Sequence, residues 1–111
     1  MERVNIFEVG RTKEGVIENP AGFFMKVNKF TEKGNVVFIY YPPGTGNELH
    51  SHEDLETVYY IVKGKGLVTI GDETELLKEG DVVFTPRNVK HQVVNDGDEE
   101  LIILEVTFKY P

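Results

Sequence analysis

Short apolar runs separated by turn-forming residues are the main pattern along the chain. Val36–Tyr41, for example, follows Gly34-Asn35 and ends at Pro42-Pro43-Gly44. Such runs, rich in β-branched and aromatic side chains and bounded by glycine, proline and asparagine, are typical of β-strands. The pattern predicts about nine strands, over Val4–Val9, Phe23–Phe30, Val36–Tyr41, Thr57–Lys63, Leu67–Ile70, Thr74–Leu77, Val82–Thr85, His91–Val94 and Leu101–Phe108.

The spacing of these predicted strands indicates a sandwich or a small barrel, because such folds place a strand roughly every 8–12 residues. No segment has a convincing helical period, since the one candidate, Asn47–Glu56, is too polar for a core helix. Gly71-Asp72-Glu73 is expected to form a hairpin loop. Leu101–Val106 is apolar on both alternating faces. One face is therefore expected in a barrel interior, and the other against a second layer or a partner subunit.

Composition supports an all-β chain and limits its partners. The 111 residues include 15 Val but one Ala, whereas helical domains depend on Ala and Leu. The net charge of −7 argues against nucleic acid and against an anionic membrane surface. Cysteine is absent, and neither a membrane-spanning apolar run nor a signal-peptide pattern is found. We expect a single cytoplasmic domain over residues 1–111, with a thermophile-like abundance of Glu and Lys.

The three histidines are the strongest candidates for chemistry. His50 and His52 are two positions apart, so on an extended chain their side chains point to the same face. His91 lies 39 residues later and opens a predicted strand that a barrel can return beside the first pair. Neutral imidazole is the commonest metal ligand and suits Zn, Fe, Cu and Ni. An isolated His-x-His pair is about as often two solvated loop residues, so the surrounding sequence decides.

The surroundings of these histidines resemble the two motifs of the cupin family. The first motif, over about residues 44–64, reads Gly, five residues, His-x-His, three or four residues, Glu, six residues, Gly. The second, over about residues 80–95, reads Gly, five residues, Pro-x-Gly, two residues, His, three residues, Asn. The matching positions are Gly44, His50, His52 and Gly64 in the first motif, and Gly80, Pro86, His91 and Asn95 in the second. The resemblance implies a single-domain jelly-roll β-barrel, the double-stranded β-helix, with His50, His52 and His91 as metal ligands.

Two positions depart from the family pattern. Asn88 replaces the glycine of the second motif, and asparagine tolerates the positive φ that this turn requires. The metal-binding Glu of the first motif falls on Thr57 when counted back from Gly64, but on Glu56 when counted forward from His52. We prefer the backward count, because it preserves the strand register and turns Thr57 inward. The alternatives are that Glu56 replaces the missing carboxylate ligand, or that no metal binds.

A shell without a carboxylate affects the choice of metal. Three neutral imidazoles leave a divalent ion its full charge, and Mn²⁺ loses the carboxylate that it favours. We expect one divalent ion, with Zn, Fe or Ni favoured over Mn. Tyr59 and Ile61 share the face of Thr57 and, with Tyr40, are candidates to line the pocket.

The resemblance implies a metal-dependent pocket protein for a small organic molecule. One interpretation is that the protein is an enzyme that catalyses an oxygenation, an isomerisation or a lyase reaction. The alternative is a non-catalytic ligand-binding or sensor module of the same family. A homodimer is expected, because the apolar residues of Phe23-Phe24-Met25 and Leu101–Phe108 exceed what one small barrel can bury.

Overall fold

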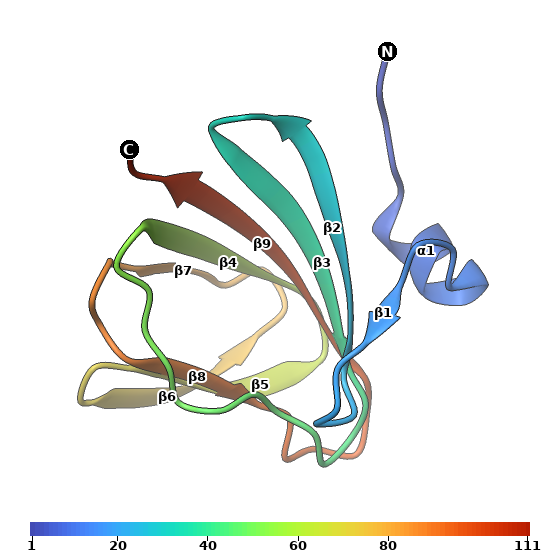
Figure 1. The fold of residues 1–111 in the computed structure, drawn as a ribbon. Coiled ribbons are helices and arrows are strands. Elements are labelled where there is room, and N and C mark those ends of the chain that lie inside the picture. The colour runs from blue at the N-terminus through green and yellow to red at the C-terminus, as the bar shows by residue number, and fades with distance from the viewer.

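The computed structural model describes all 111 residues as two antiparallel sheets and one short helix (Figure 1). The larger sheet has six strands in the order β1-β2-β3-β9-β4-β7, and the smaller has three in the order β6-β5-β8. The elements are α1 (Ile6–Thr12), β1 (Ile17–Glu18), β2 (Phe24–Thr31), β3 (Gly34–Tyr41), β4 (Leu55–Lys63), β5 (Lys65–Ile70), β6 (Glu73–Lys78), β7 (Val82–Thr85), β8 (His91–Val94) and β9 (Leu101–Lys109).

The two sheets face each other across the main apolar core, as in a jelly-roll β-barrel (Figure 1). Alternate residues of each strand point into this core, because successive side chains of a strand lie on opposite faces of its sheet. Ile39, Ile61 and Ile103 are its fully or nearly fully buried centre, contributed by β3, β4 and β9. The predicted all-β jelly roll is therefore confirmed.

The N-terminal segment differs from its prediction. Val4–Val9 was expected to form a strand, and this prediction is wrong, because Ile6–Thr12 forms a helix. The side chain of Asn5 caps the helix by accepting hydrogen bonds from the backbone N–H groups of Phe7 and Glu8, each at 3.0 Å. Val4, Ile6 and Val9 all pack in one apolar layer, so the apolar pattern of this segment is equally compatible with a short helix, which the Asn5 cap favours.

Helix α1 covers the outer face of the large sheet and builds a second apolar layer there. Val9 of the helix packs with Phe38, Tyr40 and Ile102, whose side chains point away from the barrel interior. The Tyr40 hydroxyl donates a 2.6 Å hydrogen bond to the carbonyl oxygen of Ile6, which fixes the helix on the sheet. The second layer expected behind Leu101–Val106 is thus supplied partly by the chain itself.

The other predicted strands are present, with ends shifted by no more than two residues. The hairpin between β5 and β6 is one residue tighter than expected, because Ile70 pairs with Glu73 and leaves Gly71-Asp72 as the loop. Gly71 has φ of 64°, a conformation that suits glycine in such a turn. No helix of the chain is long and apolar enough to cross a membrane.

Candidate metal centre

The three histidines come from two segments that lie side by side at one end of the barrel. His50 and His52 lie in the loop between β3 and β4, and His91 is the first residue of β8. His50 and His91 form an isolated antiparallel bridge, with reciprocal backbone hydrogen bonds of 3.0 and 2.8 Å. The backbone N–H of Asn88 also donates a 2.7 Å bond to the carbonyl oxygen of His52. The backbone therefore fixes all three ligand positions relative to one another.

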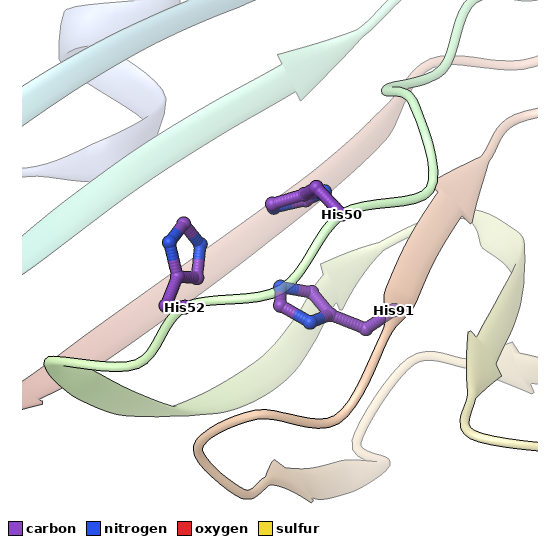
Figure 2. Close-up of side chains that lie close together, drawn as sticks. All are labelled: His50, His52 and His91. Atoms are coloured by element: carbon purple, nitrogen blue, oxygen red, sulfur yellow. The ribbon is translucent and has the colours of Figure 1, made fainter.

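The imidazole rings converge on a common space (Figure 2). One ring nitrogen of each histidine can be chosen so that all three lie within 4.8 Å of one another. Tetrahedral ligands at the usual Zn–N distance of ~2.0–2.1 Å are separated by roughly 3.3 Å. Small side-chain rotations would bring the nitrogens to this spacing, so the arrangement fits an ion held by three imidazoles.

Backbone hydrogen bonds fix the protonation of two rings. Nδ1 of His50 lies 2.7 Å from the carbonyl oxygen of Glu48, and Nδ1 of His91 lies 3.0 Å from that of Val89. A carbonyl oxygen only accepts, so each Nδ1 carries the proton and each Nε2 keeps a free lone pair. Nε2 of His91 is buried and has no hydrogen-bond partner in the protein. A buried lone pair without a donor is costly, and a bound metal ion would satisfy it.

The surroundings of His52 and His91 favour the neutral forms of these two imidazoles. Burial lowers the pKa of His52 and of His91, and the neighbouring His50 lowers both further. Because only neutral imidazole binds a metal, the lowered pKa values extend the metal-binding form toward lower pH.

The loop between β3 and β4 that carries His50 and His52, here called the ligand loop, is held against β8 by hydrogen bonds. Asn47 accepts a hydrogen bond from the backbone of Val93 through its side chain at 2.8 Å, and from the side chain of Gln92 through its carbonyl at 2.9 Å. Asn95 is completely buried, and its side-chain amide donates to the carbonyl oxygen of Tyr41 at 2.8 Å. Asn88 has φ of 66°, as expected for the residue that replaces the motif glycine.

Thr57 and Glu56 point in opposite directions. The Thr57 side chain is 2% exposed and lies in the barrel interior, paired across β4 and β7 with Thr85. Neither threonine hydroxyl has a hydrogen-bond partner in the protein. The Glu56 carboxylate instead accepts a 2.6 Å hydrogen bond from the Tyr110 hydroxyl at the surface. The interior position expected for Thr57 is therefore observed, while the role of either residue at an ion stays a prediction.

A cavity of about 600 Å³ opens beside the histidines. Its walls combine apolar side chains from the large sheet with polar groups from the ligand loop. The lining residues are Asn19, Pro20, Ala21, Phe23, Met25, Ile39, Tyr41, Asn47, Glu48, His50, His52, Tyr59 and Glu105.

Two of the predicted pocket residues lie elsewhere. Tyr59 lines the cavity, but Ile61 is fully buried in the core below it. The prediction that Tyr40 lines the pocket is wrong, because Tyr40 faces the outer layer under α1 and its neighbour Tyr41 faces the cavity.

Glu105 is a cavity residue that the sequence analysis missed. It lies on β9, and burial raises its pKa to about 7. Glu105 also raises the pKa of Tyr41 and of Tyr59, although burial is the larger cause for both tyrosines. The signal available in the sequence was a single acidic residue at an inward position of the apolar run Leu101–Val106.

Comparisons with known proteins agree with this architecture. A family model described as a cupin domain matches residues 37–107. An uncharacterized protein of Methanocaldococcus jannaschii is 38% identical over 63 residues, which cover 57% of this chain and 50% of that protein. The oxalate-binding protein of Thermotoga maritima is 37% identical over 65 residues, which cover 59% of this chain and 54% of that protein. This chain thus spans about half the length of these two relatives.

Solved structures share the fold over a larger part of the chain. The protein TT1209 of Thermus thermophilus matches with a TM-score of 0.78 and 27% identity, and the match covers 100% of both chains. The family model covers both segments that carry the histidines and all the strands from β4 to β8. The chain belongs to the cupin family.

Proposed function

We propose that the protein binds one divalent metal ion through His50, His52 and His91 and uses it to hold a small organic acid for catalysis. The observation that carries this proposal is the convergence of the three rings, with Nε2 of His91 buried and without a partner. A structural cluster would leave this nitrogen unsatisfied at a cost of about 1–3 kcal/mol. An ion would remove that cost and explain why both Nδ1 atoms are turned to carbonyl groups.

The donor set favours Zn, Fe or Ni over Mn. All three donors are neutral nitrogens, and no carboxylate lies in the cluster. When bound, the ion would supply positive charge that polarises a substrate oxygen. His50, His52 and His91 would hold the ion, and Thr57 would stand in place of the carboxylate ligand of the family motif.

The cavity supports a small acid as the class of substrate. Asn47, Tyr41 and Tyr59 offer hydrogen bonds, and Phe23 and Met25 form an apolar wall. No Lys or Arg lines this cavity, so an anionic substrate would depend on the ion for its positive partner. A small acid is also favoured by the name of a relative, the oxalate-binding protein of Thermotoga maritima, because oxalate is a small dicarboxylate.

Metal loading followed by ligand titration tests the proposal. Chelator-treated protein is reloaded with Zn²⁺, and oxalate or pyruvate is added while heat is measured by calorimetry. We expect saturable binding by the loaded protein and its loss in His91→Ala, with Glu56→Ala as the matched control. Equal binding by metal-free and loaded protein would contradict the proposal.

A non-catalytic binding module is the second candidate function. The name of the Thermotoga relative favours it, because that name describes binding and no reaction. A turnover screen of the loaded protein with small acids separates the two candidates. If the loaded protein binds small acids but forms no product from any of them, the binding module is favoured.

We also propose that the protein is a homodimer. Helix α1 covers the outer face of the large sheet over β3 and the first part of β9, but β7 and the neighbouring parts of β4 and β9 keep exposed apolar side chains. The large apolar side chains exposed there are Tyr60, Val82, Phe84 and Phe108. Contiguous exposed apolar residues of this kind are typical of a protein interface.

A further inference from the structure

Glu105 lies inside the barrel at a defined place relative to the metal centre. Strand β9 lies between β3 and β4 in the large sheet (Figure 1), and Glu105 pairs directly with Val37 on one side and Tyr59 on the other. It has the same inward direction as Ile103, two residues earlier, which is fully buried in the core.

Tyr59 connects Glu105 to the histidine cluster. Directly paired residues on one face of an antiparallel sheet have Cβ atoms about 4.5–5.5 Å apart, so Glu105 and Tyr59 are neighbours in the cavity wall. The ring centroid of Tyr59 is 6.3 Å from that of His91. Glu105 is absent from the group of ligand atoms that lie within 4.8 Å of one another. The carboxyl and the histidines His50 and His52 instead line the same cavity of about 600 Å³, which is large enough for a small molecule.

The surroundings of Glu105 give it no structural partner. The single ion pair of the protein joins Lys63 and Glu100, so no cation neutralises the Glu105 carboxylate. The titratable groups that share the cavity are Tyr41 on β3, Tyr59 on β4, and Glu48, His50 and His52 in the ligand loop. A carboxyl without a cation in such a place costs stability, and residues of this kind are typical of functional sites.

We propose that Glu105 is a catalytic residue that transfers a proton to and from a carbon atom of a small 2-oxo acid held in the cavity. This inference rests on the proposed function, because the substrate is the small acid assigned there to the metal centre. It restricts the reaction to proton-transfer chemistry, such as isomerisation, among the reactions that the family resemblance allows.

The proposed step balances without any further reactant. A C–H bond beside the carbonyl group breaks, and its proton forms an O–H bond on a Glu105 carboxylate oxygen. The electron pair of the C–H bond becomes a C=C bond, while the carbonyl π pair moves to the oxygen atom and gives an enolate. Return of the proton to the same carbon regenerates the substrate, and its return to another atom gives an isomer. Neither an oxidant nor a reductant is consumed.

The protonation of Glu105 suits this role. Burial raises the pKa of this carboxyl to about 7 in the metal-free protein, and a bound cation would lower it, which favours the carboxylate form that accepts the proton. A group whose pKa is close to the working pH is the most effective general acid or base.

Deuterium exchange into pyruvate tests the proposal. The Zn²⁺-loaded protein is incubated with pyruvate in D₂O, and the loss of the methyl proton signal is followed by NMR. We expect exchange above the rate with free Zn²⁺. Glu105→Gln should reduce the protein-dependent rate about 10²–10⁴-fold, the usual contribution of a general acid or base. Glu105→Asp should retain part of the rate, because it keeps a carboxylate, and Glu100→Gln should match the unchanged protein.

Metal content and pyruvate affinity, measured on the same samples, distinguish failure of the proposed function from failure of the role of Glu105. Failure of the unchanged protein to bind zinc or pyruvate would overturn the proposed function itself. Normal binding without exchange, or exchange unaffected by Glu105→Gln, would overturn only the role of Glu105. Loss of zinc in Glu105→Gln would make Glu105 a metal ligand, which also contradicts the proposal.

A second measurement requires neither zinc nor substrate. In protein labelled with ¹³C at the glutamate carboxyl carbons, the spectrum is recorded as a function of pH. One signal, missing in Glu105→Gln, should titrate close to pH 7. Titration of the Glu105 signal in the range of an exposed glutamate would contradict the proposal, since such a group is almost fully ionised at neutral pH.

Discussion

Replacing Glu105 by glutamine should stabilise the protein above neutral pH, and the effect should vanish in mild acid. Glutamine has nearly the same shape as glutamic acid but never becomes charged. In the native protein, burial raises the pKa of Glu105 from the ordinary value of 4.5 to about 7. The native state therefore holds the Glu105 proton more tightly than the unfolded state does.

The sign and size of the effect follow from that difference. Below about pH 4.5 the carboxyl is protonated in both states, so glutamic acid and glutamine contribute similarly. As the pH rises from 4.5 to about 7, the unfolded state releases its proton first, and the unchanged protein loses stability. Each pKa unit corresponds to about 1.4 kcal/mol, so the full difference is about 3 kcal/mol. Glu105 keeps some contact with water in the cavity, which reduces the expected loss to about 2 kcal/mol.

Urea unfolding of both proteins between pH 4.5 and 8.5, followed by circular dichroism, measures this effect. The proteins are compared with chelator present, because a bound cation would itself lower the pKa of Glu105. The free energies of unfolding should diverge with rising pH and become parallel above about pH 8. Glu100→Gln is the matched control, because Glu100 is partly exposed beside Lys63 and does not line the cavity. Parallel curves for Glu105→Gln and the unchanged protein would refute the argument that Glu105 is held in a costly environment.

Three further predictions concern the metal centre and the assembly. Thr57→Glu should raise the affinity for Mn²⁺ or Fe²⁺, because it adds a carboxylate on the interior face. Glu56→Ala should change the metal affinity little, and competition titrations measure both effects. The opposite result would show that Glu56, and not Thr57, stands at the position of the carboxylate ligand. Dialysis with chelator below the ordinary histidine pKa of ~6.5 should remove the metal while circular dichroism still reports a folded barrel, and the lowered pKa values of His52 and His91 should delay the loss to more acidic pH. If metal removal unfolds the protein instead, the ion is structural. Light scattering should give the mass of a dimer at micromolar concentration, and Phe84→Lys should shift it toward the monomer; a stable monomer before substitution would contradict the proposed assembly.

Much of the fold could be predicted from the sequence because its strands are short and sharply bounded. The predicted ends of Val82–Thr85 and His91–Val94 coincide with β7 and β8. The failure at the N-terminus has a local cause. Seven residues are too few to show a helical period, and the Asn5 cap that selects the helix acts through two backbone hydrogen bonds.

The candidate site also has residues that could be predicted from the sequence and residues that could not. The histidines could be predicted because their spacing in the two motifs carries the information. Glu105 belongs to neither motif, and its importance depends on pairing with Tyr59 on another strand, a tertiary relationship. Tyr40 and Tyr41 are adjacent and chemically identical, so the register of β3 against its neighbours decides which one faces the cavity. A one-residue change of register would exchange them.

The metal stoichiometry of the protein and its histidine variants tests the central claim most directly. Samples are loaded with Zn²⁺, dialysed without chelator at pH 7.5, and analysed by mass spectrometry for zinc per chain. We expect one ion per chain in the unchanged protein and in Glu56→Ala, and loss of most of the bound zinc in His50→Ala, His52→Ala and His91→Ala. Retention of zinc by all three histidine variants, or no zinc in the unchanged protein, would contradict a metal centre formed by these residues.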